Sequence, residues 1–256
     1  IYSYHVDTSW LHRTHIRSSE KSRNKASVIT LPSYRFVNGC VWTPLSDFKL
    51  LITGGGMPDA TRTAVCVEVT RDFAVHYKPP MSESRRYHAS AHYQGFTYVF
   101  GGQSSYLEYS GCERLKLEAQ EWERLEPMPE LCSNSSIIAH ELTNALYCLG
   151  GSDQYHRDID SIQRFTVTTA TWTLLSVKLP DHCTNFACFK ADKSRIYFTI
   201  CQALLAFDPQ AESIEELRQL EDCATSHYGP SVYYRGALYS SFIGGKAKVT
   251  RLHYEF

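Results

Sequence analysis

The chain has 256 residues, with 26 Lys and Arg against 27 Asp and Glu and a formal net charge of −1. This balance excludes a bulk attraction to nucleic acid or to an anionic membrane surface, and the apolar runs have only strand length, so we expect neither nucleic-acid binding nor membrane insertion. The nine cysteines are odd in number and form no C-x-x-C motif. They therefore predict free thiols in a reducing, cytoplasmic compartment.

Residues 1–25 are predicted to contain two short strands, IYSYHVD and WLHRTHI, followed by the polar surface loop RSSEKSRNK. No signal peptide is visible at this end, since neither a charged nor an apolar leader region occurs. The first residue is Ile and not Met, so we expect the chain to be part of a longer one.

From residue 26 onward, an apolar run that ends in two glycines recurs along the chain. A degenerate copy, SRIYFTI, ends at Thr199 without glycines, and successive copies are 47, 49, 49 and 45 residues apart. A near-constant period of this size indicates a repeat architecture. The glycine pairs are Gly54-Gly55, Gly101-Gly102, Gly150-Gly151 and Gly244-Gly245. The predicted units cover about 26–80, 81–129, 130–180, 181–222 and 223–256.

Each unit contains four predicted short strands that are separated by turn signals. Examples of these strands are residues 87–93, 111–117 and 161–167. Four strands in about 45–50 residues make one small sheet, which buries both faces only when neighbouring sheets stack in a ring. The glycine pair predicts positive φ and a close backbone approach. The recurrent tryptophans, Trp122 and Trp172, are predicted to pack between sheets. Residues 211–222 have helical propensity, but their place in the unit predicts an outer strand.

This pattern resembles the kelch repeat family over roughly residues 26–256. The glycine pairs, Trp122, Trp172 and the Met-Pro or Leu-Pro steps carry the resemblance. It implies an all-β fold, a single β-propeller domain over residues 1–256 made of four-stranded blades. We favour six blades with part of the protein absent. Five blades follow if residues 1–16 complete the last unit. The degenerate fourth unit has lost its glycines and its tryptophan.

The kelch architecture also occurs in galactose-oxidase-like copper enzymes, so the histidines and tyrosines of this chain are candidate metal ligands. The closest pair, His88 and His92, would share one face of a strand but lie about 13 Å apart, too far for one ion. No H-E-x-x-H or H-x-H motif appears. We therefore expect no catalytic residue, no metal and no cofactor, with the copper radical oxidase as the alternative.

In kelch proteins that bind peptides, residues at the start of each first strand face the partner. Arg suits bidentate recognition of carboxylates, so Arg85 and Arg86 favour a polar or acidic partner segment, unless either pairs within the ring. Polar loops after the glycine pairs add Tyr106 and Tyr155 as candidates. The candidate positions at the first strands are Tyr34, Arg35, Arg85, Arg86, Ser133, Asn134, Thr184, Asn185, Ser226 and His227.

The resemblance therefore predicts a non-catalytic protein–protein interaction scaffold or adaptor. The partner would be a protein bound by loops around the central channel. The expected setting is the cytoplasm, with the cytoskeleton as one location for such an assembly.

Overall fold

The structure is a computed structural model, and it describes only part of the chain. The described residues are 2–5, 10–14, 26–30, 39–46, 49–56, 64–70, 74–104, 111–180, 188–190, 192–200, 203–219, 231–234, 237–241 and 249–253. In the first three and the last three of these ranges, only strand pairing is described. Every regular element within these ranges is a β-strand.

Within the described ranges the strands form antiparallel sheets, each made of strands that are consecutive in the chain. The first sheet contains β1 (Tyr2–His5), β2 (Trp10–Thr14) and β3 (Ala26–Thr30). The second contains β4 (Val41–Ser46), β5 (Lys49–Thr53), β6 (Cys66–Val69) and β7 (Val75–Lys78). The third contains β8 (Ala89–Tyr93), β9 (Phe96–Phe100), β10 (Cys112–Lys116) and β11 (Glu123–Leu125).

The remaining sheets continue the same order. The fourth contains β12 (Ser136–His140), β13 (Ala145–Leu149), β14 (Ser161–Thr166) and β15 (Thr171–Lys178). The fifth contains β16 (Cys188–Phe189), β17 (Ile196–Ile200), β18 (Ala203–Asp208) and β19 (Ser213–Gln219). The last contains β20 (Ser231–Tyr234), β21 (Ala237–Ser241) and β22 (Val249–His253).

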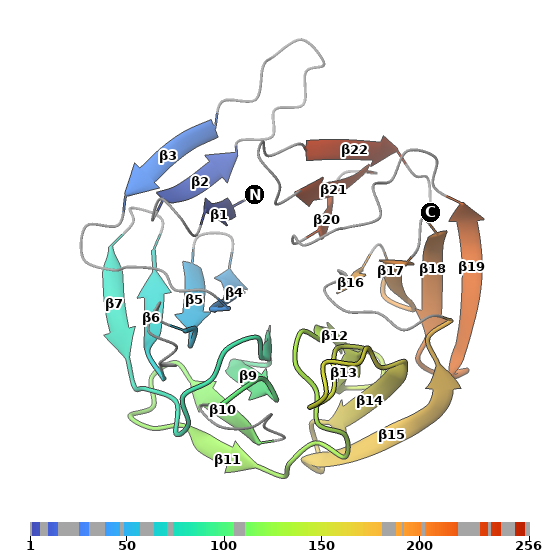
Figure 1. The fold of residues 1–256 in the computed structure, drawn as a ribbon, viewed down its shortest axis with the longest axis horizontal. Coiled ribbons are helices and arrows are strands. Elements are labelled where there is room, and N and C mark those ends of the chain that lie inside the picture. Colours follow the sequence, from blue (N-terminus) through green and yellow to red (C-terminus); the bar gives the residue numbers. More distant parts are fainter. Residues whose placement is uncertain are drawn as a thin grey trace.

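The sheets stand side by side around a common centre, as blades of a β-propeller do (Figure 1). The first strands face the centre, where β4 contacts β8, β8 contacts β12, and β12 contacts β16. The last strands, β7, β11, β15 and β19, lie at the periphery (Figure 1). The predicted all-β propeller of four-stranded units is confirmed, whereas the number of blades and the division of the chain into domains stay predictions.

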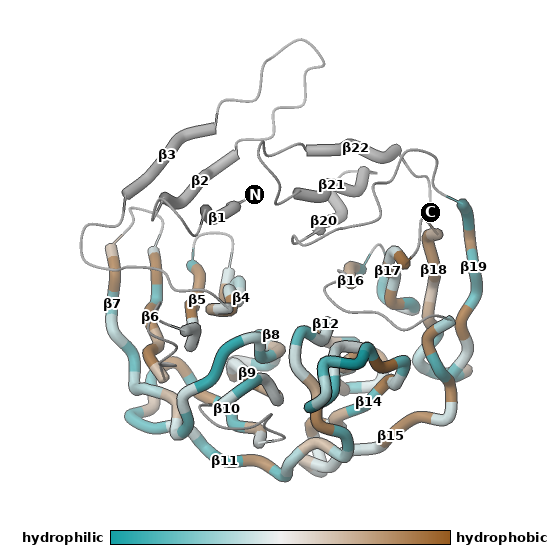
Figure 2. The backbone as a smooth tube through the Cα atoms, in the orientation of Figure 1, coloured by the Kyte–Doolittle hydropathy of each residue, from teal (hydrophilic) through white to brown (hydrophobic). Residues whose placement is uncertain are grey.

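The hydrophobic core lies between neighbouring sheets. Leu51 of the second sheet and Met81, which follows that sheet, pack against the third sheet. Their neighbours there are Val99, Leu115 and Trp122. Similar clusters join the third sheet to the fourth and the fourth to the fifth. Middle strands such as β18 are therefore apolar and buried, whereas the outer strand β19 is mostly hydrophilic and exposed (Figure 2). Each sheet depends on its neighbours for burial, as expected for a repeat that is unstable alone.

The glycine pairs have the backbone conformation that the sequence predicted. All six described members, from Gly54 to Gly151, have positive φ. A Cβ on Gly54 would lie 2.2 Å from the carbonyl oxygen of Arg85, and one on Gly101 would lie 2.4 Å from that of Cys132. Gly54 and Gly101 thus lie directly against the backbone that leads into the next sheet, where no larger residue fits.

The two tryptophans pack between sheets and also form hydrogen bonds there. Trp172 lies 4.7 Å from the ring centroid of Phe100 in the preceding sheet. Its Nε1 donates to the carbonyl oxygen of Glu126 at 3.0 Å. Trp122 repeats this contact one sheet earlier, donating to the carbonyl oxygen of Pro79 at 2.9 Å. The predicted packing role is confirmed, and the hydrogen bond is an addition that the sequence did not reveal.

Two segments test the strand assignments. Residues 213–219 form strand β19, paired along β18, so the outer-strand prediction is confirmed over the helical propensity of 211–222. Strand β3 pairs with β2, so residues 26–30 belong to the sheet of β1 and β2 and not to the next unit, where the sequence placed them. The first four-stranded sheet therefore begins after Thr30.

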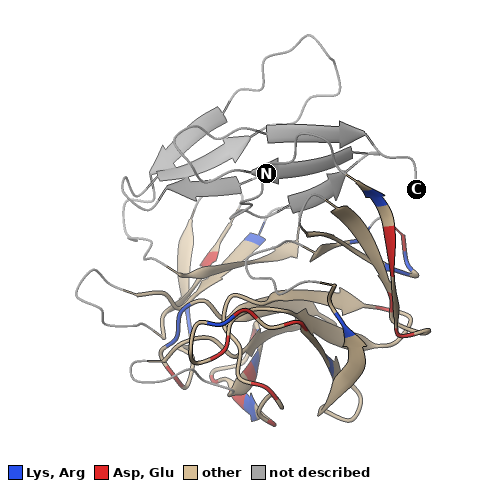
Figure 3. Cartoon of the chain, turned by 45° about the vertical axis from the view of Figure 1, so that its right-hand side comes forward, with Lys and Arg blue, Asp and Glu red and all other residues tan. Residues whose placement is uncertain are grey.

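Charged residues are distributed without a field of one sign over the described part of the molecule. Acidic and basic residues alternate along the connections between strands, and most strand residues are uncharged (Figure 3). The described residues contain no helix that is long and apolar enough to cross a membrane.

Candidate functional site

The described candidate residues lie where the first strand of a sheet begins or the second strand ends, and they are Arg85, Arg86, Ser133, Asn134 and Tyr155. We call this the diglycine end, because the glycine pairs lie there. Backbone hydrogen bonds join the two connections of one sheet at this end, between Arg86 and Gln103 and between Ser133 and Ser152. The diglycine end therefore presents rigidly held connections, which suits a binding surface.

Arg85, a predicted contact residue, is wholly buried. Its Nη2 lies 2.6 Å from Glu113 Oε1, and its Nη1 donates to the carbonyl oxygens of Gly101 and Gly111 at 3.1 and 2.7 Å. Glu113 Oε2 accepts two further hydrogen bonds from Ser82, each of 2.9 Å. The expectation that Arg85 faces a partner is therefore wrong, because the side chain points into its own sheet and is neutralised there.

Arg86 differs from its neighbour in orientation and in charge compensation. Its side chain is half-buried, and its Nε donates to Gln103 Oε1 at 3.1 Å. The guanidinium lies 5.0 Å from the centroid of the Tyr87 ring. Within the described part of the chain Arg86 forms no ion pair, so its positive charge is uncompensated at the diglycine end.

The structure also corrects the alignment between the third and fourth sheets. The backbone pairing makes Arg86 equivalent to Ser133 and Arg85 equivalent to Cys132, one residue away from the predicted match. The turn between β12 and β13 is two residues longer than the turn between β8 and β9, so equivalent residues lie two positions further from the glycine pair in the fourth sheet, whereas the predicted match allowed for one. A distance counted back from the glycine pair therefore does not identify the equivalent position.

Ser133 and Asn134 have structural roles in the backbone. Ser133 is buried, whereas Asn134 is half-buried and has a φ of 55°. The amide of Asn134 donates to the carbonyl oxygen of Tyr87 at 2.8 Å, and the amide of Tyr87 donates to that of Gly39 at 2.9 Å. These bonds join three successive sheets. Because Ser133 is buried, only Asn134 of these two predicted residues has a partly accessible side chain.

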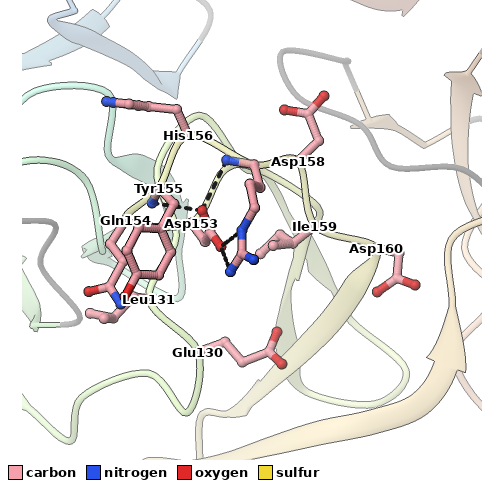
Figure 4. A pocket seen from close by; sticks show the side chains of 10 residues that line it. Glu130, Leu131, Asp153, Gln154, Tyr155, His156, Asp158, Ile159 and Asp160 are labelled. Carbon is pink, nitrogen blue, oxygen red and sulfur yellow. Dashed lines mark hydrogen bonds and ion pairs between the residues drawn. The ribbon is translucent and has the colours of Figure 1, made fainter.

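Tyr155 lies in the connection between β13 and β14 and is 66% exposed. Asp153 holds this connection in shape, because its Oδ1 accepts hydrogen bonds from the amides of Tyr155 and Arg157. Its Oδ2 pairs with the guanidinium of Arg157, as the dashed lines in Figure 4 show. The connection therefore presents the tyrosine ring on a locally rigid turn.

A pocket of about 860 Å³ lies between this connection and the one before β12. We call it the 153–160 pocket, and Figure 4 shows its lining side chains from close by. Apolar and acidic groups share the lining. Its walls include Glu130, Leu131, Tyr155, Asp158, Ile159 and Asp160. The sequence analysis identified Tyr155 but missed the acidic residues. The long polar loop after Gly151, which contains Asp158 and Asp160, is the feature of the sequence that could have indicated them.

The other predicted contact residues lie outside the described residues. They are Tyr34, Arg35, Tyr106, Thr184, Asn185, Ser226 and His227. Their participation in a site stays a prediction.

The two histidines considered as metal ligands have separate surroundings. His88 is buried, with Nε2 2.8 Å from Thr53 Oγ1, and burial together with the charge of Arg85 holds its pKa well below the usual value. His92 Nδ1 lies 3.1 Å from Thr97 Oγ1 instead. No three His, Cys, Asp or Glu side chains in the described ranges are grouped to hold a metal ion.

The described cysteines are free thiols, in agreement with the prediction. Burial raises the pKa of Cys66 and of Cys112 to about 12, so both thiols are neutral at physiological pH. These cysteines act as small apolar residues of the core, and the remaining three, Cys183, Cys201 and Cys223, lie outside the described residues.

Comparison with known proteins supports the relationship that the repeats suggest. The Kelch motif matches residues 84–129, which span the third sheet and its tryptophan. Residues 84–129 therefore carry a Kelch motif. The chain is 24% identical over 154 residues to Kelch-like protein 38 of Rattus norvegicus, covering 60% of this chain and 26% of that protein.

Other relatives share the repeat over shorter stretches. Identity is 30% over 95 residues to Kelch domain-containing protein 10 of Xenopus tropicalis, and this stretch covers 35% of the present chain and 23% of the relative. Beta-scruin of Limulus polyphemus is 26% identical over 103 residues, which cover 38% and 11% respectively. The matched stretches thus span about a quarter or less of the relatives' length.

Proposed function

We propose that this protein is a non-catalytic protein-interaction module, acting as a scaffold or as the substrate-adaptor part of a larger protein. It would bind a polar segment of a partner protein at the diglycine end, around the centre of the ring. The relatives are named as kelch-like or kelch domain proteins, which supports an interaction role. The buried thiols support a reducing compartment, and location at the cytoskeleton remains part of the proposal.

The uncompensated charge of Arg86 is the observation that carries this proposal. Arg85 is neutralised by Glu113, whereas Arg86 forms no ion pair within the described ranges. A carboxylate of the partner could therefore pair with Arg86, since a guanidinium suits bidentate recognition of carboxylates. Asn134 and Tyr155, at the same end of the next sheet, would add hydrogen-bonding and amphipathic contacts.

The test is affinity capture of the protein from its native source, followed by mass spectrometry of bound proteins and metal. The variant Arg86→Glu should lose a stoichiometric protein partner. The control variant Leu142→Ala changes an exposed residue in the β12–β13 turn, at the opposite end of the sheet, and should retain that partner. Retention by both variants would place the contact elsewhere on the protein.

The copper radical oxidase alternative has no specific observation in its favour among the described residues. The same capture experiment tests it, because the metal content is measured together with the proteins. One copper ion per chain without a protein partner would overturn the interaction proposal.

A further inference from the structure

The two sides of the 153–160 pocket are held in place independently of any partner. On one side, Gln163 Oε1 accepts a hydrogen bond from the Glu130 amide at 3.0 Å, and its Nε2 donates to the Glu130 carbonyl oxygen at 3.3 Å. On the other side, the amide of Ile159 donates to the carbonyl oxygen of Gly151 at 2.9 Å. A pocket with fixed backbone loses little conformational entropy when it binds a ligand.

The acidic side chains of the pocket are not all neutralised. Asp153 pairs with Arg157 at 2.6 Å, and Asp160 pairs with Lys178 at 3.3 Å. Glu130 and Asp158 form no ion pair within the described residues. The pocket therefore has two uncompensated carboxylates, from the two connections that enclose it.

Apolar surface accompanies these charges. Leu131 and Ile159 are half-buried in the lining, and the Tyr155 ring is 66% exposed beside them. The Arg157 guanidinium lies 4.9 Å from the centroid of this ring, so the tyrosine already has a cation as a neighbour. Lysine and arginine combine an apolar stem with a cationic head. The apolar lining of the pocket suits the stem, and the free carboxylates suit the head.

We propose that the 153–160 pocket binds a lysine or arginine side chain of the partner segment. This inference rests on the proposed function and adds a basic anchor to a segment that also contacts Arg86. The head of the basic residue would pair with Glu130 or with Asp158, which lie on the two sides of the pocket, and its stem would lie against Leu131, Ile159 and Tyr155. A divalent cation is a weaker fit, because no three ligating side chains converge in the described part of the chain.

The experiment uses a phage-displayed library of random 15-residue peptides, selected on the wild-type protein. Selected peptides should be enriched in Lys or Arg at one position. Their affinity should fall about tenfold in Glu130→Gln/Asp158→Asn, because two attractive charges are removed. The control Glu118→Gln/Glu121→Gln removes two exposed carboxylates from the β10–β11 turn at the opposite end, and should bind as the wild type does.

The outcomes separate the pocket from the proposed function. Peptides that depend on Arg86 but show no basic preference would overturn the pocket and leave the proposed function intact. An equal loss of affinity in both double variants would also overturn it, since the effect would then come from net charge. If no peptide is selected and capture finds no protein partner, both proposals fail. Unchanged thermal unfolding of Glu130→Gln/Asp158→Asn verifies that the variant folds.

Discussion

Arg85 Nη2 and Glu113 Oε1 lie 2.6 Å apart, and both side chains are shielded from solvent. The pair connects the segment before β8 with the third strand of the same sheet. Glu113 also holds Ser82, so one carboxylate fixes the connection that leads into the sheet from β7. The arrangement explains why two adjacent arginines have different roles, the first inside the protein and the second at its surface.

Arg85→Met should lower the free energy of unfolding by about 3–5 kcal/mol, because it leaves the Glu113 carboxylate buried without its cation. Urea unfolding measures the change. In Arg85→Met/Glu113→Gln most of the loss should be recovered, since the amide oxygen still accepts the Ser82 hydrogen bonds. The control Arg124→Met concerns a side chain that is 71% exposed and should change stability by less than about 0.5 kcal/mol. A double variant no more stable than Arg85→Met would contradict this account.

Gly101→Ala should destabilise the protein by at least about 3 kcal/mol, because the new Cβ would overlap the carbonyl oxygen of Cys132 in the next sheet. Gly95 is a matched control. It also has positive φ, but a Cβ there would meet nothing within 4 Å, so Gly95→Ala should cost only about 1–2 kcal/mol of backbone strain. Equal losses in the two variants, measured by thermal unfolding, would show that φ alone and not close packing requires Gly101.

Trp172→Ala should cost about 3 kcal/mol, since it removes contacts with Phe100 and Phe165 and the hydrogen bond to Glu126. Trp172→Phe keeps an aromatic ring and should lose less. Leu174 lies two residues further along β15 and is 42% exposed, so Leu174→Ala should change stability by under about 1 kcal/mol. Chemical denaturation ranks the three variants, and a cost for Leu174→Ala equal to that of Trp172→Ala would rule out the proposed inter-sheet role.

Lowering the pH below about 6.5 should destabilise the protein through His88. Burial, and then the nearby Arg85, keep the pKa of this histidine well below the usual value of about 6.5, so the unfolded chain takes up a proton that the folded protein does not. Stability should therefore fall by about 1.4 kcal/mol per pH unit between 6.5 and the folded pKa. Denaturation at several pH values should show this slope reduced in His88→Gln. An identical slope in both proteins would mean that other groups cause the acid sensitivity.

The repeat pattern identifies the fold because its signals are local. Each glycine pair follows an apolar strand, and Trp122 and Trp172 occupy the same place after the third strand of their units, so the arrangement of strands can be inferred along the chain. The pattern even predicts strand β19 against helical propensity, since pairing with β18 decides the conformation there. The predicted equivalence of contact positions in different sheets is wrong where the turn between His140 and Ala145 is longer. The sheet tolerates a longer turn without any change in strand pairing, so the spacing along the sequence changes while the fold does not.

The sequence by itself therefore determined the all-β repeat, its glycine positions and the free thiols, all of which depend on residue type and spacing. Only the tertiary structure decided that Arg85 is buried while Arg86 keeps its charge at the diglycine end. The reason is that the partner of Arg85 lies 28 residues away in another strand. The 153–160 pocket likewise exists only because two connections of one sheet meet, which brings Glu130 and Asp158 to the same surface.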